Sequence, residues 1–342
     1  MRHIIHVMKL YAVAFMLTGC TTQLIGIYDE PHVLIASPDE SVTLDGKVII
    51  KADTVMGKDK IDVVGNYLVA TSVDNTKAFF SVYSLDGKYV TSFGAEGHAA
   101  NEFSQGIHVV EAQGDDAFWV NDVNQACLKL VDLAQSIKTQ SCVVKQTVPT
   151  ASRSINSFAP LNGSCWMEQE TDNNYQLCRK NVSKGTIEQS IDLYKPTQDV
   201  FQTYYSKMIM NEDKTAMASA MIYINQVNFL ALGGDAPEKH SASLYTEAKM
   251  PDNSGDMSKR TYYYCGLAGS SRYVYALYNN QSCTEAFQVK KPMEIHVFDW
   301  KGDFVKKLCV KDYIICGIAV DKNDKNLYAA DNEGNVYKYS LE

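Results

Sequence analysis

The sequence has few features of a membrane-spanning or nucleic-acid-binding protein. Its apolar N-terminal run falls well short of the roughly 20 residues that a membrane-spanning helix requires. It contains no tract rich in Lys and Arg, and its 32 basic residues against 40 acidic ones give a formal net charge of −8. Nucleic-acid binding depends on clustered Lys and Arg that face phosphates. We therefore expect no nucleic-acid partner.

The sequence also lacks the common short motifs of catalytic, cofactor and metal sites. There is no Gly-x-Ser-x-Gly nucleophile elbow, and the Gly-rich residues 94–97 are followed by no Gly-Lys-Ser/Thr of a phosphate loop. No Cys-x-x-Cys pair occurs, and the polar residues 250–256 lack the regular oxygen-ligand spacing of a calcium loop. We therefore assign no catalytic, cofactor-binding or metal-ligating residue and expect no cofactor.

The most informative segment that is present ends at Cys20. Residues 17–20 read Leu-Thr-Gly-Cys, the lipobox of a bacterial lipoprotein signal, and they close a short apolar run. Arg2 and Lys9 supply the basic region that precedes such a run. We predict that residues 1–19 are removed and that Cys20 becomes a lipidated N-terminus. The alternative is a buried N-terminal strand or helix in which Cys20 is an ordinary core cysteine.

A lipid on Cys20 would set both the location and the domain boundaries. A lipoprotein N-terminus carries several acyl chains, which make its attachment to the membrane stable. Thr21 rather than Asp follows the cysteine. By the sorting rule of enterobacterial lipoproteins, this favours the outer membrane, with the body facing the periplasm or the cell exterior. We expect residues 20–41 to be a tether and residues 42–342 to form a single domain.

Eight cysteines remain after Cys20, and an even number in an exported protein suggests disulfides. Two pairs are disulfide candidates because each flanks a turn-like connection: Cys165 with Cys178, and Cys127 with Cys142. The pairing of the last four stays open, because sequential pairs and a pair of Cys265 with Cys316 both fit the sequence: Cys265, Cys283, Cys309 and Cys316.

Short β-rich runs alternate with Asp/Asn/Gly turns over most of the chain, and helical periodicity is nearly absent. Residues 79–85 and 89–93 are two such runs. Between them, Asp86-Gly87 offers the positive φ that tight hairpin turns require. The same pattern returns at residues 294–310, around a turn that contains Gly302. Two hairpins of one design, more than 200 residues apart, indicate a repeat.

Units of four strands divide the chain into six blades of about 40–50 residues each. The units run over residues 59–94, 106–147, 155–194, 203–247, 261–311 and 313–342. The last unit ends after three strands, and residues 42–50 precede the first unit without another partner. We predict an all-β, six-bladed β-propeller of four-stranded antiparallel blades whose ring is closed by this N-terminal strand. Seven blades would leave too few residues for that strand and the longer loops.

The Asp86-Gly87 turn belongs to a longer motif. Residues 82–94 end in Phe-Gly and are followed by Glu96-Gly97 and then by Asn101-Glu102-Phe103. This motif resembles the first-blade signature of the TolB-like six-bladed propeller lipoproteins and, more loosely, that of NHL-repeat propellers. Ala99-Ala100 stand where such loops usually carry Gly-Pro. The family is largely without assigned chemistry, so the resemblance implies a fold rather than a function.

Several polar residues are candidates for a site at the centre of the ring. A catalytic pocket there would need carboxylates from different inner strands to converge. Five lie near expected strand ends on different blades: Asp62, Glu111, Glu168, Asp213 and Asp321. His98 and His108 could act as a base or a metal pair, although a loop position and a strand position also explain them. Asp115-Asp116 follow Gly114 and fit a turn.

Clustered tyrosines are candidates for a surface that binds carbohydrate or peptide, since amphipathic rings suit such surfaces. They are Tyr204-Tyr205, Tyr262-Tyr263-Tyr264 and Tyr273, Tyr275 and Tyr278. Packing between blades is the alternative role. We favour a monomeric, membrane-anchored binding or scaffolding propeller with a protein, peptide or glycan partner. The competing hypothesis is an enzyme, of lyase, lactonase or glycosidase type, with its site in the central channel.

Overall fold

The structure, a computed structural model, describes residues 24–38, 41–51, 60–72, 75, 77–171, 174–194, 203–233, 237–251, 256–286, 288–311 and 314–342. Cys20 and the predicted signal, residues 1–19, lie outside the described residues.

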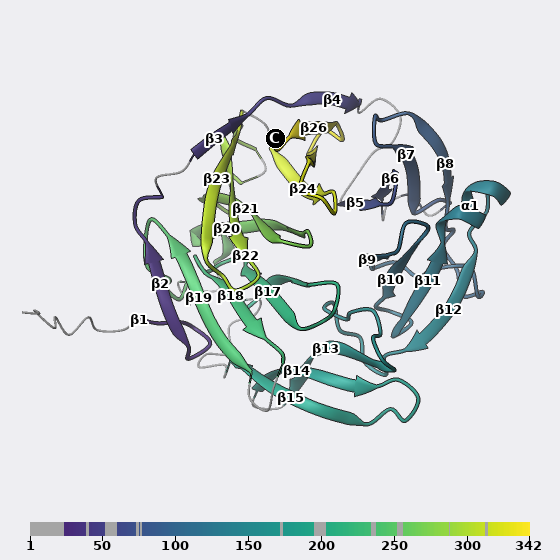
Figure 1. The fold of residues 1–342 in the computed structure, drawn as a ribbon, viewed down its shortest axis with the longest axis horizontal. Coiled ribbons are helices and arrows are strands. Elements are labelled where there is room, and N and C mark those ends of the chain that lie inside the picture. The colour runs from purple at the N-terminus through teal and green to yellow at the C-terminus, as the bar shows by residue number, and fades with distance from the viewer. Residues whose placement is uncertain are drawn as a thin grey trace, which may run out of the picture.

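Six β-sheets are arranged in a ring, and each sheet is one blade of a six-bladed, all-β propeller (Figure 1). The first blade contains β5 (Lys60–Val64), β6 (Tyr67–Thr71), β7 (Phe80–Ser84) and β8 (Tyr89–Phe93). The second contains β9 (Ile107–Gln113), β10 (Ala117–Asp122), β11 (Cys127–Asp132) and β12 (Val144–Pro149). Helix α1 (Leu133–Thr139) joins β11 to β12, and the Asp132 carboxylate caps it by accepting a 2.9 Å hydrogen bond from the Gln135 N–H.

The remaining blades differ in strand number. The third has three strands, β13 (Ser164–Thr171), β14 (Asn174–Asn181) and β15 (Ile187–Tyr194). The fourth begins with β16 (Ser206–Met210), β17 (Ala216–Met221), β18 (Val227–Ala231) and β19 (Glu238–Leu244). After the 3₁₀ helix η2 (Met257–Lys259), the fifth begins with β20 (Thr261–Gly269), β21 (Tyr273–Ser282), β22 (Met293–Asp299) and β23 (Phe304–Val310). The sixth contains β24 (Ile315–Val320), β25 (Asn326–Asp331) and β26 (Val336–Ser340).

The N-terminal segment adds strands to the outer edges of three successive blades (Figure 1, purple). β1 (Leu24–Ile25) and β2 (Pro31–Ile35) lie on the fourth blade, β3 (Ser41–Leu44) on the fifth and β4 (Lys47–Ile50) on the sixth. β2 and β3 pair parallel with β19 and β23, whereas β4 pairs antiparallel with β26. The prediction of four antiparallel strands in every blade is therefore wrong for the third, fourth and fifth blades.

The same segment corrects two predicted boundaries. Residues 20–41 were expected to be a tether, but those from β1 to β2 are part of a blade. Residues 42–50 were expected to be one strand, but they divide between two blades. The physical reason is that the outer strands of the fourth and fifth blades present unpaired N–H and C=O groups, which an extended segment satisfies.

β4 supplies the fourth strand of the last blade and lies beside the first. Ile50 is buried at 5% exposure, and Val48 lies opposite Tyr337 of β26. The predicted Asp-Gly turn of the first blade approaches this strand closely. Gly87 has φ of 85°, and a Cβ there would lie 2.0 Å from the Ile49 carbonyl oxygen. Glycine is therefore required both by the turn and by the contact.

The hydrophobic core is divided among the interfaces between blades. Between the first and second blades, the Phe80 ring lies 5.3 Å from both the Phe103 and the Phe118 rings, in edge-to-face contacts. Burial of each such side chain stabilises the fold by about 1.5–3 kcal/mol. Phe103 ends the motif of the family resemblance, so that motif has a packing role.

The eight cysteines of the described residues are free thiols, and neither predicted pair faces its partner. Cys178 lies opposite Met167, and Cys165 lies opposite Lys180, which leaves the two cysteines on a diagonal of about 7–8 Å. Cys127 begins β11, whereas Cys142 lies beyond its other end, roughly 16 Å away. A disulfide requires Cα atoms within about 7 Å, so the register explains the difference from the expectation.

Candidate functional site

The inner strands of the six blades surround the ring axis (Figure 1). They are β5, β9, β16, β20 and β24. In the third blade the residues around Ser157 take this place, because Ser157 forms a bridge with Met167 on the inner edge of β13. Each blade begins at its inner strand, so the first residues of these strands lie toward one face of the ring. β5 contacts both β9 and β24, and β20 contacts both β16 and β24. Side chains from different blades therefore meet near the axis.

Four of these side chains form what we call the axial cluster: Lys60 and Asp62 of β5, His108 of β9 and Lys207 of β16. The Lys60 ammonium donates a hydrogen bond to the Val109 carbonyl and lies 3.5 Å from the Asp62 carboxylate. Burial and, to a smaller extent, the charges of Lys60 and Lys207 lower the pKa of His108 to about 4. The cluster thus joins the first, second and fourth blades.

Positive charge dominates the axial cluster. Lys207 is exposed to solvent and forms no ion pair with any residue that the structure describes. The pKa of Lys207 is nevertheless lowered, first because its surroundings are partly desolvated and second because the nearby Lys60 ammonium repels another positive charge. Asp62 is the one carboxylate of the cluster. Burial raises its pKa although Lys60 opposes that effect.

A second level of charge lies further along the axis. Glu111 is three residues beyond His108 on β9, about 10 Å in an extended strand. Its carboxylate accepts a hydrogen bond from the ammonium of Lys214, in the turn after β16. The Lys214 side chain is 5% exposed. This ion pair joins the second blade to the fourth, which are not neighbours in the ring.

The five predicted carboxylates do not converge. Glu168 of β13 accepts a 2.9 Å hydrogen bond from the Asn156 amide, and burial raises its pKa. Asp213 accepts a hydrogen bond from the Thr215 hydroxyl at 2.7 Å in an exposed turn. Asp321 accepts from the Asn326 side-chain amide at 2.8 Å in another turn. The remaining two, on β5 and β9, belong to the axial cluster and to the ion pair below it.

The other candidates are mostly structural. His98 is exposed in the loop after β8 and does not join His108. Asp115 and Asp116 are exposed in the turn after Gly114, whose φ is 65°, as the turn interpretation predicts. The Glu102 carboxylate accepts a 3.0 Å hydrogen bond from the Ala99 N–H and so shapes the loop of the family motif.

The predicted tyrosines divide between core and surface. Four of them are buried: Tyr204, Tyr264, Tyr275 and Tyr278. Tyr205 is 43% exposed and lies two residues before Lys207. Tyr262 makes an edge-to-face contact with Tyr223, with ring centroids 5.8 Å apart, and the Arg260 guanidinium lies 5.3 Å from the Tyr223 ring. Sequence reasoning missed Tyr223 and Arg260 because neither belongs to a motif.

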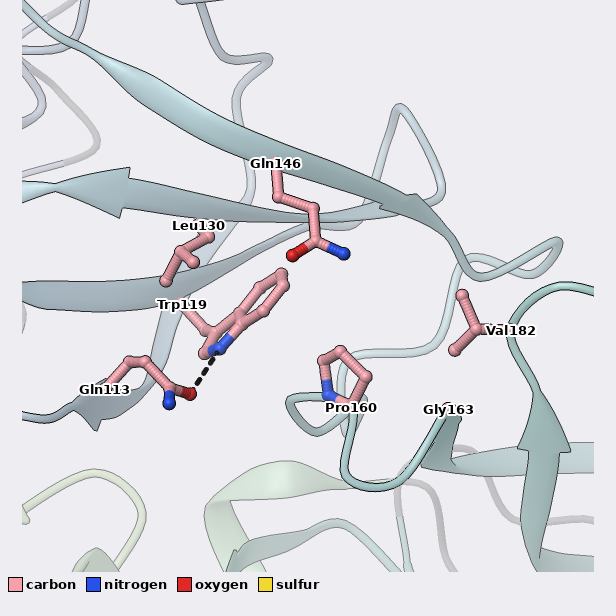
Figure 2. A pocket seen from close by; sticks show the side chains of 7 residues that line it. All are labelled: Gln113, Trp119, Leu130, Gln146, Pro160, Gly163 and Val182. Carbon is pink, nitrogen blue, oxygen red and sulfur yellow. Dashed lines mark hydrogen bonds between the residues drawn. The ribbon is translucent and has the colours of Figure 1, made fainter.

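A pocket of about 360 Å³ lies between the second and third blades (Figure 2). It is lined by Gln113, Trp119, Leu130, Gln146, Pro160, Gly163 and Val182. The Trp119 indole N–H donates a 3.1 Å hydrogen bond to the Gln113 amide oxygen. The lining has no charged side chain, and Trp119 is only 3% exposed. The pocket therefore offers shape and two amide groups but little aromatic surface.

Within the part of the chain that the structure describes, no helix is long and apolar enough to cross a membrane. In those same residues, no three His, Cys, Asp or Glu side chains gather as metal ligands.

Comparison with known families identifies one match. The chain matches the TolB-like 6-blade propeller-like family over residues 44–323. A search of curated protein sequences found no match.

Solved structures share the fold at low identity. A member of the DUF4221 family from Bacteroides vulgatus has a TM-score of 0.59 and 9% identity, over 90% of this chain and 99% of that one. A Bacteroides fragilis protein described as exported has a TM-score of 0.58 and 12% identity, over 90% and 99%. The β-propeller domain of Cps50 (Swd1) from Myceliophthora thermophila has a TM-score of 0.53 and 11% identity, over 87% and 100%.

Proposed function

This chain belongs to the TolB-like six-bladed propeller family, and we propose that it is a lipid-anchored binding protein of the bacterial cell envelope whose ligand site is the axial cluster. The lipobox at Cys20 supports the envelope location. So does the structural similarity to an exported Bacteroides fragilis protein. In this proposal the lipid holds the propeller at the outer membrane, and the axial face binds a protein, peptide or glycan partner without changing it chemically.

The separation of the buried acids is the observation that carries the binding role. General acid–base chemistry needs titratable groups that face one reacting atom. Glu111 instead forms an ion pair with Lys214, and Glu168 is hydrogen-bonded to Asn156. The groups that do converge from different blades are the two lysines and the histidine of the axial cluster. These three groups suit the binding of an anionic ligand. They include no pair of carboxylates that could catalyse hydrolysis.

The short distance between anchor and fold supports the membrane role. Leu24, which begins β1 on the fourth blade, is four positions after Cys20. An extended chain of that length spans about 14 Å. The lipid would hold the outer edge of the fourth blade within that distance of the membrane. We also propose that β4 closes the ring, since it follows the anchored edge and pairs with the last strand of the chain.

Pull-down from intact cells tests the anchored binding role. The wild-type protein and Cys20→Ser would be captured under the same conditions, with the ring itself unchanged in both. We expect a specific partner with the wild type and its loss with Cys20→Ser. A partner retained in full by Cys20→Ser, or no specific partner at all, would contradict the proposal. Protease shaving of whole cells would separately show whether the body faces the periplasm or the exterior.

A further inference from the structure

We propose that the axial cluster binds an oxyanion, a carboxylate or phosphate group, at the end of a small ligand. This inference rests on the proposed function, because it takes the axial cluster as the binding site and names the chemistry of the ligand. It is carried by the arrangement of Lys60, His108 and Lys207 on three different blades.

The lysines of this chain show what a purely structural lysine does. The buried Lys129 lies 3.5 Å from the Asp122 carboxylate. Lys214 contacts the Glu111 carboxylate, and Lys180 donates a 2.9 Å hydrogen bond to the Thr150 carbonyl. Each of these buried or half-buried lysines has an acceptor within the fold. Lys207 lies on an inner strand, where its charge acts on His108, but it has no ion-pair partner among the described residues.

The charge balance of the axial cluster favours an anion. Lys60 and Lys207 carry two positive charges, and Asp62 supplies at most one negative charge. Repulsion between neighbouring cations costs free energy, which a bound anion removes. One Asp62 carboxylate oxygen is buried and has no hydrogen-bond partner in the part of the chain that the structure describes. A ligand group that carries a proton or hydroxyl could donate to that oxygen while its oxyanion contacts Lys207.

The ion pair at the second level limits how far the ligand reaches. Glu111 and Lys214 lie further along the axis, and their contact neutralises the charges there. An anion beyond the axial cluster would meet the Glu111 carboxylate and be repelled. The oxyanion therefore stops at Lys207, and the rest of the ligand lies toward the face where the inner strands begin.

Aromatic side chains on that face suit a ring in the ligand. Tyr205 is exposed and lies two residues before Lys207, roughly 7 Å along the chain. Tyr262 and Tyr223 lie at the same end of the neighbouring fifth and fourth blades. Tyrosine rings contact the apolar faces of sugars with little entropic cost. A sugar that carries a carboxylate fits both the lysines and the tyrosines.

Titration calorimetry of the full-length lipoprotein in detergent tests the inference with three probes: glucuronate, inorganic phosphate and neutral glucose. We expect saturable binding of glucuronate, or of phosphate, with affinity that falls as salt is added. The two anions distinguish a carboxylate from a phosphate ligand. No binding of either anion, or binding of glucose as tight as that of glucuronate, would overturn the inference.

Matched lysine variants locate the site. Lys207→Met is expected to weaken anion binding at least tenfold. Lys322→Met removes an exposed lysine that is paired with Glu212 elsewhere on the ring, and it should change the affinity less than twofold. Lys207→Gln, which keeps a polar side chain, serves as the second variant if the methionine protein does not fold. Equal affinity in the wild type and in a folded Lys207 variant would overturn the inference.

The pH dependence of glucuronate binding gives an independent readout. The charged groups that act on His108 are Lys60 on β5 and Lys207 on β16. Asp62 forms an ion pair with Lys60, and Glu111 lies on the same strand as His108. A bound anion opposes the lysines and raises the pKa of His108, so binding takes up protons. We expect affinity to rise from pH 8 to pH 5 and the rise to shrink in His108→Gln. An affinity that falls over this range would contradict the inference.

The two proposals fail in different experiments. If the purified wild-type protein binds neither anion, the proposed ligand class is wrong, but a partner captured only with the Cys20 anchor would still support the anchored role. If Cys20→Ser retains its partner in full, the anchored role is wrong, but anion binding measured by calorimetry would still support the proposed ligand class.

Discussion

Lys214 of the fourth blade forms an ion pair with Glu111 of the second blade, across the position of the third. The third blade has only three strands and no added outer strand among the described residues. An ion pair between its two neighbours therefore fixes the spacing of the ring where a blade is smallest. The same contact lies further along the axis than the axial cluster, and in it Lys214 neutralises the acid on β9.

Breaking this ion pair should destabilise the protein. Lys214→Met leaves the Glu111 carboxylate without its partner, and removal of one member of a buried pair costs about 3–5 kcal/mol. Glu111 is 25% exposed, so we expect about 2–3 kcal/mol, measured by urea unfolding. The double variant with Glu111→Gln should recover part of the loss. Lys322→Met, which breaks an exposed pair, should cost less than about 1 kcal/mol. Equal effects of the two lysine variants would contradict this role.

The segment from β1 to β2 on the fourth blade, which we call the strap, should have a stability that depends on pH through Glu30. Glu30 is 3% exposed and accepts a 3.1 Å hydrogen bond from the Gln226 amide, and burial raises its pKa from 4.5 to about 7. A carboxyl with a raised pKa in the folded state holds its proton there, so stability is full below pH 4.5 and falls as pH rises toward 7. Glu30→Gln should raise Tm at pH 8 and flatten this dependence.

The matched control for Glu30 is Glu238→Gln, an exposed carboxyl on β19 of the same blade. Its melting temperature should follow the wild type at pH 5 and pH 8. A Glu30→Gln protein that melts below the wild type at pH 8 would show that the ionised carboxylate stabilises the strap.

The role of β4 in closing the ring can be tested at Ile50. Ile50→Ala removes a buried side chain that packs with Leu68 and Tyr328, and it should cost about 2–4 kcal/mol. Amide hydrogen exchange should then speed up in β24–β26 and in the first blade together. Val48→Ala, at an exposed position of the same strand, should leave exchange near the wild type. Faster exchange confined to β4 would argue against closure by this strand.

Thiol reactivity should follow burial and not sequence spacing. Burial raises the pKa of the Cys142 thiol to about 12, so this group stays protonated and unreactive. Cys309 is half-buried and lies 3.4 Å from the Ser41 hydroxyl at an exposed edge. We expect iodoacetamide to modify Cys309 well before Cys142 in the native protein, as measured by mass spectrometry. A Cys127–Cys142 or Cys165–Cys178 disulfide in the same peptides would contradict the register of the sheets.

Blade boundaries could be predicted because their signals are local. Asp86-Gly87 marks a hairpin by its own backbone preferences, and the predicted unit 59–94 agrees with β5 to β8. The outer strands could not be predicted in the same way. β2 pairs with β19, whose residues are more than 200 positions away, so this strand depends on a distant edge. Local sequence carries no signal for that edge.

The candidate site was predicted only in part. Asp62 and His108 were singled out by residue type, and both belong to the axial cluster. Lys60 and Lys207 were missed, because a lysine at the ring axis has the same sequence signature as a solvated lysine on an outer edge. The ion pair of Glu111 with Lys214 was also missed, since it joins residues more than 100 positions apart on non-adjacent blades.

Titration of glucuronate and, separately, of phosphate into the full-length wild-type protein, followed by recovery of the ligand, distinguishes an anion-binding propeller from a catalytic one. We expect at least one of the two anions to give saturable heat that is lost in Lys207→Met, and we expect that ligand to be recovered unchanged. An absence of saturable heat with both anions, or a ligand that is consumed, would contradict an anion-binding propeller without catalytic activity.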